Sequence, residues 1–133
     1  MRAVTSRSVI DGIRRKSADC APKEACGLLF GEGLAISGWQ AAENVADMPE
    51  TRFEIDPATL FAALRAERAG GAKIVGYWHS HPSGDASPSA TDAAMAAPDG
   101  KLWLIVAGEE VRLWRAIEGG AVHQRFEPVS ISA

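Results

Sequence analysis

The hydrophobic positions of the chain change their spacing from one segment to the next. Near the N-terminus, apolar residues recur at helical spacing and predict a helix over residues 8–19. The apolar run of residues 25–30 is short and ends at a Gly-Glu-Gly turn, which predicts a buried strand that returns as a second strand through Leu34 and Ile36. Residues 43–52 are polar and rich in turn formers, so they predict a loop.

A second helix and a further strand follow this loop. Residues 52–55 predict a brief strand, and Asp56 before Pro57 is typical of a helix start. The apolar stripe of this helix consists of Leu60, Phe61 and Leu64. Gly70-Gly71 ends the helix, and a strand begins at residues 73–77.

The C-terminal part of the chain predicts more strands. Residues 101–107 and 111–117 are strand-like and joined by a glycine-containing turn, so we expect a hairpin. A last strand lies around residues 122–126. This mixture of strands and helices predicts an α/β fold, with a mixed β-sheet flanked by helices in a single domain over residues 1–133.

Composition narrows the class of protein. The 133 residues are 47% hydrophobic and 23% charged, which is enough to bury a core without disulfides. The net charge is −3 and the basic residues are scattered, so we expect no nucleic-acid partner. Residues 1–8 lack the apolar region of a signal peptide, and no apolar stretch approaches membrane-spanning length, so we expect neither a signal peptide nor a spanning helix. Because only Cys20 and Cys26 could pair, we expect a soluble protein of the reducing cytoplasm.

The segment His79-Ser80-His81 carries the strongest chemical signal. If the preceding strand continues into it, alternation sends both imidazoles to one face and Ser80 to the other. Two of the three histidines of the chain then converge on one point, which favours a metal site over two separate structural roles. A catalytic zinc site uses three protein ligands and leaves a fourth position to water.

The third ligand is left open between two carboxylates. Asp92 follows at a spacing that suits a loop returning to the histidines, and Asp85 lies in the intervening turn-rich loop. The stretch from Ser89 to Asp92 also fits a helix capping box. The two interpretations are compatible, because a helix N-terminus could present its carboxylate and hydroxyl to a metal.

Other metal enzymes fit less well. A (β/α)₈ barrel hydrolase typically needs about 250 residues. A zinc nucleobase deaminase requires His-x-Glu and a later Pro-Cys-x-x-Cys, and the chain has neither. Two histidines and one carboxylate could also hold ferrous iron in an oxygenase, although the sequence shows no cosubstrate pocket.

Three stretches together resemble the JAMM (MPN+) metalloprotease family, in particular its short bacterial members. They are Glu24 to Leu29, Gly76 to Pro82 and Ser89 to Asp92. The stretch of residues 52–57 and the C-terminal hairpin resemble the same group, so the likeness covers most of the chain.

The resemblance implies a role for each site residue. His79, His81 and Asp92 would hold one Zn²⁺ per chain, Glu24 would be the general acid and base, and Ser89 would stabilise the tetrahedral intermediate. By residue type alone the base could be any of Glu24, Glu43, Glu54 and Glu109. Glu24 differs physically only because it precedes a buried strand, where an idle carboxylate is costly.

The resemblance also implies the substrate. Family members cut peptide or isopeptide bonds after the diglycine tail of ubiquitin-like proteins, and short bacterial relatives process sulfur-carrier proteins of the β-grasp fold. The chain lacks long insertions, which favours a small carrier protein. Trp78 could line the cleft for the tail, although core packing suits it better, and His123 on the last strand is expected to be structural. The alternative is a non-catalytic MPN scaffold, but such modules usually lack the ligand set that is intact here. The oligomeric state stays open.

Overall fold

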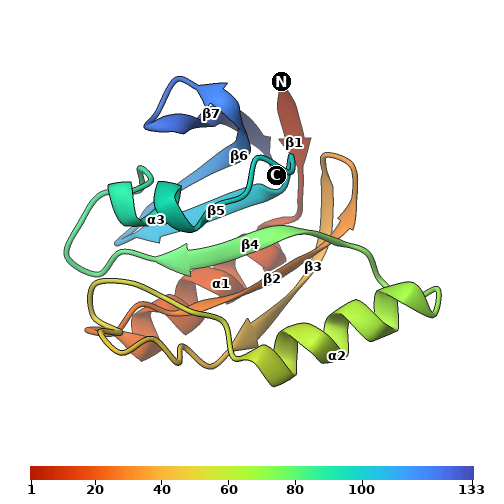
Figure 1. Ribbon diagram of the computed structural model, residues 1–133, viewed down its shortest axis with the longest axis horizontal. Helices are drawn as coiled ribbons and strands as arrows, with labels where there is room; N and C mark the ends of the chain where they lie inside the picture. The colour runs from red at the N-terminus through yellow and green to blue at the C-terminus, as the bar shows by residue number, and fades with distance from the viewer.

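Seven strands form one sheet that closes on itself in the order β1-β3-β2-β4-β5-β6-β7 (Figure 1). A computed structural model describes all residues, 1–133. The strands are β1 (Arg2–Val4), β2 (Cys26–Glu32), β3 (Ala35–Ala42), β4 (Ile74–Ser80), β5 (Leu102–Ala107), β6 (Glu110–Gly120) and β7 (Gln124–Ser132). The predicted mixed sheet with helices is confirmed, but its closure into a barrel was not predicted.

Closure depends on β1, the shortest strand. β1 pairs in parallel with β7 over three residues and with β3 through Val4 opposite Ala35. The other neighbours are antiparallel, except that β4 and β5 run parallel. β4 therefore lies in the middle of the sheet, between β2 and β5, and its last residues are held by hydrogen bonds on both edges.

Three helices accompany the sheet: α1 (Arg7–Cys20), α2 (Pro57–Arg68) and α3 (Ala90–Met95). In Figure 1, α1 passes behind β2 and β4, and α2 runs along the lower edge. α1 begins where Ser6 accepts a hydrogen bond from the N–H of Val9, and it buries Val9 and Ile13. α2 begins at Asp56 and Pro57 as predicted.

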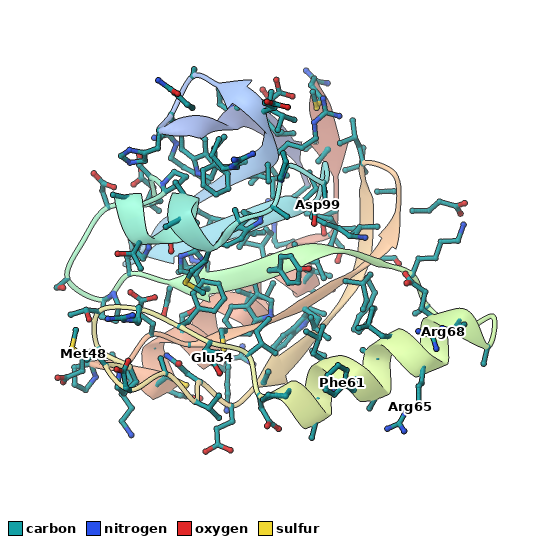
Figure 2. All side chains as sticks on the ribbon, viewed as in Figure 1. Met48, Glu54, Phe61, Arg65, Arg68 and Asp99 are labelled. Atoms are coloured by element: carbon teal, nitrogen blue, oxygen red, sulfur yellow. The ribbon has the colours of Figure 1, made fainter.

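Three details of the predicted elements are wrong. Phe61 does not belong to the apolar stripe of α2, because it is 59% exposed and lies with Arg65 at the outer side of the helix (Figure 2). Residues 52–55 form no strand, and a single bridge joins Asn44 to Ile55. β6 and β7 are also longer than predicted, so His123 lies in the turn between them instead of on a strand.

The buried side chains form separate clusters on the two sides of β4. Trp78 belongs to the cluster beneath α1, is fully buried, and donates its indole N–H to the carbonyl of Gln40 at 3.1 Å. Core packing is therefore its role in the fold. A second cluster contains Trp103, Trp114 and Phe126 and borders the histidines. No helix is both long and apolar enough to cross a membrane.

Candidate metal centre

The two histidines of the motif lie at the end of β4 and face the same side. His79 is paired with Cys26 of β2 and Ile105 of β5. The backbone N–H of His81 continues the ladder by donating to the carbonyl of Val106 at 2.8 Å. Alternation sends the intervening Ser80 the other way, where its hydroxyl accepts from the N–H of Ala25. The local geometry predicted from the sequence is therefore present.

Three side-chain atoms meet at one point of this site. Nε2 of His79 and Nε2 of His81 are 3.0 Å apart. Oδ2 of Asp92 lies 3.2 Å from the first and 3.1 Å from the second. Donors placed about 2.0 Å from the centre of a tetrahedron lie about 3.3 Å from one another. These three atoms therefore have the spacing of three corners of a zinc coordination sphere, and their chemistry fits that ion.

α3 delivers Asp92 to this point. Ser89 caps the helix, since its hydroxyl accepts from the N–H of Asp92 at 3.0 Å and its own N–H donates to Oδ2 of Asp92 at 2.9 Å. This is the reciprocal capping box that the sequence predicted. The carboxylate oxygen that closes the box is the same atom that contacts the histidines, so capping leaves Asp92 in place beside them.

Asp85 contributes to the site through its backbone. Its carbonyl oxygen lies 2.7 Å from Nδ1 of His81. A carbonyl can only accept, so Nδ1 carries a proton. Once Nε2 gives up its own proton, that nitrogen is free to bind a metal. The exposed Asp85 carboxylate accepts from the N–H of Ser87 instead. Between the two candidates for the third ligand, the structure brings only Asp92 to the histidines.

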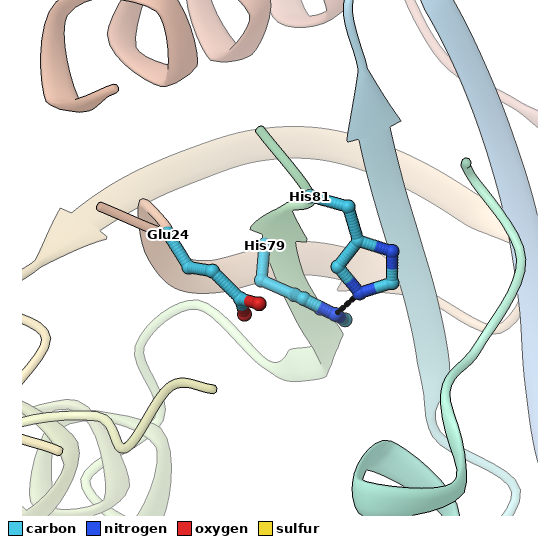
Figure 3. A group of neighbouring side chains, drawn as sticks. All are labelled: Glu24, His79 and His81. Atoms are coloured by element: carbon cyan, nitrogen blue, oxygen red, sulfur yellow. Dashed lines mark hydrogen bonds between the residues drawn. The ribbon is translucent and has the colours of Figure 1, made fainter. Parts of the chain in front are cut away.

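Glu24 lies beside the histidines as a second carboxylate. One of its oxygens and a ring nitrogen of each histidine lie within 4.8 Å of one another. Figure 3 shows the Glu24 carboxylate directed toward the two imidazoles. Asp92 is hydrogen-bonded to both histidines, whereas no hydrogen bond joins Glu24 to either of them. The alternatives Glu43, Glu54 and Glu109 are all exposed.

The backbone of Glu24 is fixed by the loop opposite. Its N–H donates to the carbonyl of Pro49 at 2.7 Å, and its carbonyl accepts from the side-chain amide of Asn44 at 2.9 Å. The carboxylate itself is buried, and Oε1 has no hydrogen-bond partner. An unpartnered buried carboxylate is rare in proteins and favours a functional role.

The electrostatic environment shifts the pKa values of the two carboxylates in opposite directions. Burial raises the pKa of Glu24 to about 7, and the nearby Asp92 adds to the increase while His81 opposes it. Burial acts in the same direction on Asp92, but hydrogen bonds from both histidines and Ser89 outweigh it and hold the pKa of Asp92 well below its usual range. Burial lowers the pKa of His79, which favours the neutral imidazole that binds metals.

Two residues of the site carry no recognisable signal in the sequence. The ring of Phe53 stacks on His79 with centroids 4.4 Å apart, although the sequence placed it on a strand. Asn44 donates to the carbonyls of Glu24 and Arg52, so one side chain joins the loop to the site. Both contacts depend on tertiary packing that residue spacing does not encode.

A family model described as prokaryotic homologs of the JAB domain matches residues 6–117. The chain belongs to this family. The matched range contains all five residues of the candidate site, and the resemblance stated from the sequence is confirmed. A JAB1/MPN domain protein from Archaeoglobus fulgidus has the same fold, with a TM-score of 0.60 at 18% identity over 98% of this chain and 97% of that one.

Several named relatives are similar to most of the chain. A desampylase from Haloferax volcanii is 36% identical over 74% of this chain and 72% of its own length. A probable TtuB-protein conjugate cleaving protease from Thermus thermophilus is 32% identical over 80% and 78%. A CysO-cysteine peptidase from Mycobacterium tuberculosis is 29% identical over 83% and 77%. The chain is a JAMM-type metalloprotease, as the sequence predicted.

Proposed function

We propose that this protein is a zinc-dependent peptidase or isopeptidase that hydrolyses the amide bond after the C-terminal Gly-Gly of a ubiquitin-like or sulfur-carrier protein of the β-grasp fold. The observation that carries the proposal is the shared contact of Asp92 Oδ2 with both imidazoles beside an unpartnered Glu24 carboxylate. With Cys20 and Cys26 both free, we place this activity in the reducing cytoplasm.

In this proposal His79, His81 and Asp92 hold one zinc ion per chain. When bound, zinc supplies a water molecule with a pKa near 7 and polarises the substrate carbonyl. The three side chains are preorganised for this task, because the Asp85 carbonyl orients the imidazole of His81 and the capping box orients Asp92.

Glu24 acts as the general base and then as the general acid. A carboxylate beside the metal ligands can accept a proton as water attacks and return it to the leaving amine. The lack of a hydrogen-bond partner at Oε1 leaves this atom available for transfer. Burial keeps bulk water from competing for the proton.

Ser89 donates a hydrogen bond to the developing oxyanion. Its oxygen already accepts from the N–H of Asp92, and this leaves the hydroxyl hydrogen free to donate. Preorganised donors of this kind act strongly in a water-poor site. The Ser89 hydroxyl therefore caps α3 through its oxygen and can still donate its hydrogen to the oxyanion.

The substrate class is supported by the relatives, whose names specify a TtuB-protein conjugate and CysO-cysteine. Both names describe cleavage of a conjugate of a small protein modifier, TtuB or CysO. We infer that this chain also cleaves conjugates of a small protein modifier. We infer a diglycine tail on that modifier because glycine has no side chain that a narrow binding site would exclude.

The direct test is to incubate the zinc-loaded protein with a β-grasp carrier whose Gly-Gly tail is extended by a peptide, and in parallel with a lysine isopeptide of the same carrier. Mass spectrometry should show cleavage after the second glycine. A carrier ending in Gly-Val is the matched control and should stay intact. The proposal fails if no diglycine-tailed carrier is cut, or if the Glu24→Gln variant cuts as fast as the wild type.

A further inference from the structure

The segment between β4 and α3, residues 82–89, joins the two halves of the metal centre. It contains no helix or strand, yet it must deliver two side chains to the histidines in a fixed orientation. Residues far away in the sequence hold it. The indole N–H of Trp114 donates to the carbonyl of Ala86 at 3.0 Å, and Nε2 of His123 lies 3.0 Å from the carbonyl oxygen of Pro88.

The contact of His123 acts on the peptide unit that leads into Ser89. A carbonyl oxygen only accepts, so Nε2 of His123 must donate. The N–H of the same peptide unit belongs to Ser89 and donates to Oδ2 of Asp92 at 2.9 Å. The peptide plane between Pro88 and Ser89 is therefore held at both ends, by His123 at its oxygen and by Asp92 at its nitrogen.

The series of hydrogen bonds continues into the metal centre. Oδ2 of Asp92 is the atom that contacts Nε2 of both histidines of the motif. Hydrogen bonds in such a chain polarise and strengthen one another. A rotation of the peptide plane would displace the Ser89 hydroxyl and the Asp92 oxygen together.

The turn that carries His123 holds two residues at positive φ. The N–H of Arg125 donates to the carbonyl of Val122 at 3.0 Å, and φ is +51° at His123 and +55° at Gln124, as in a type I′ turn. Such turns favour asparagine and glycine at these positions, because other side chains disfavour positive φ. Histidine tolerates positive φ better than most residues, so the turn can present its side chain to Pro88.

We propose that His123 is a positioning residue of this site. By donating to the carbonyl of Pro88, it fixes the orientation of Ser89 and Asp92 from the turn between β6 and β7. Its expected effect on turnover rests on the proposed function, but its effect on metal binding does not.

Three substitutions separate the hydrogen bond from the turn. His123→Asn favours the positive φ but places its amide too near the backbone to reach Pro88. His123→Gln presents an amide N–H at a reach similar to that of histidine Nε2. Gln124→Asn changes only the exposed neighbour and is the matched control.

We expect His123→Asn to be at least as stable to heat as the wild type. In competition with a chromophoric chelator, it should bind zinc about 10-fold more weakly. On the carrier substrate its kcat should fall by about 10–100-fold while KM changes little. His123→Gln should restore most of both losses, and Gln124→Asn should match the wild type.

Wild-type zinc affinity in His123→Asn would overturn the proposal. So would equal losses in His123→Asn and Gln124→Asn, because the turn alone would then account for them. If the wild type cuts no carrier, the proposed function fails, and the zinc affinities of the same variants still decide the role of His123.

Discussion

The two carboxylates beside the histidines are equally buried but differently partnered. Asp92 is 2% exposed, accepts from the backbone of Ser89, and contacts both imidazoles. Glu24 is 5% exposed, and one of its oxygens has no partner. The pKa of Asp92 is held well below its usual range, whereas that of Glu24 rises to about 7.

Hydrogen-bond partners, and not burial, therefore determine which of the two buried acids stays ionised and which one can take up a proton. A carboxylate that is saturated with hydrogen bonds stays ionised, which suits a metal ligand. A buried carboxylate without partners gains and loses its proton near neutral pH, which suits proton transfer.

Asp92→Asn should have the largest effect, because it removes the negative ligand while keeping the shape of the side chain. We expect zinc affinity to fall by more than the ~100-fold typical of a residue that only supports a ligand, with turnover abolished. Metal analysis after dialysis measures the loss. Asp85→Asn is the control and should keep zinc, since only its carbonyl contacts the site. Zinc retention by Asp92→Asn at wild-type affinity would refute the assignment.

Glu24→Gln should separate the two carboxylates most clearly. The variant should bind about one zinc per chain like the wild type and lose about 10²–10⁴-fold in kcat, because amide nitrogen and oxygen do not shuttle the proton. Single-turnover cleavage with parallel metal analysis gives both numbers. Glu43→Gln changes an exposed glutamate and should be fully active. A zinc-free Glu24→Gln variant would make Glu24 a ligand instead of the base.

Ser89→Ala should lower kcat by about 10²–10³-fold through loss of the oxyanion donor. It should also lower the free energy of unfolding by about 1 kcal/mol through loss of the cap. Ser89→Thr retains a hydroxyl and should recover much of both. If cleavage by Ser89→Ala were undiminished while its stability fell, the residue would be a cap alone.

The pH dependence of stability gives the smallest predicted effect and needs no substrate. The pKa of Glu24 rises on folding from 4.5 to about 7. Since the folded protein holds the proton more tightly, the metal-free wild type loses stability as pH rises through this window. Glu24→Gln has no ionisable group at this position. The unfolding free energy of Glu24→Gln minus that of the wild type should therefore increase by about 2 kcal/mol between about pH 5 and about pH 8, a figure that is reduced for solvent screening. Urea unfolding of chelator-treated proteins measures this, and an advantage independent of pH would contradict it.

Local signals made much of this site predictable. The alternation of the His79 to His81 segment, the cap at Ser89 and the start of α2 at Pro57 each depend on neighbours within a few residues, and all are present in the structure. The ranking of Glu24 above other glutamates needed the family resemblance, because residue type is the same for all.

Features that depend on distant contacts could not be derived from residue spacing. The three residues of β1 close the barrel only because β7 and β3 lie beside them. The choice between Asp85 and Asp92 depends on the path of a loop that Trp114 and His123 hold from more than 25 residues away. No spacing within the loop encodes those partners.

The division of roles between Asp92 and Glu24 is tested most directly by crystals grown with zinc and measured at the zinc absorption edge. The account predicts one anomalous peak about 2.0–2.2 Å from Nε2 of His79, Nε2 of His81 and an oxygen of Asp92, with the Glu24 carboxylate outside bonding distance. A peak bonded to Glu24 with Asp92 turned away would contradict it.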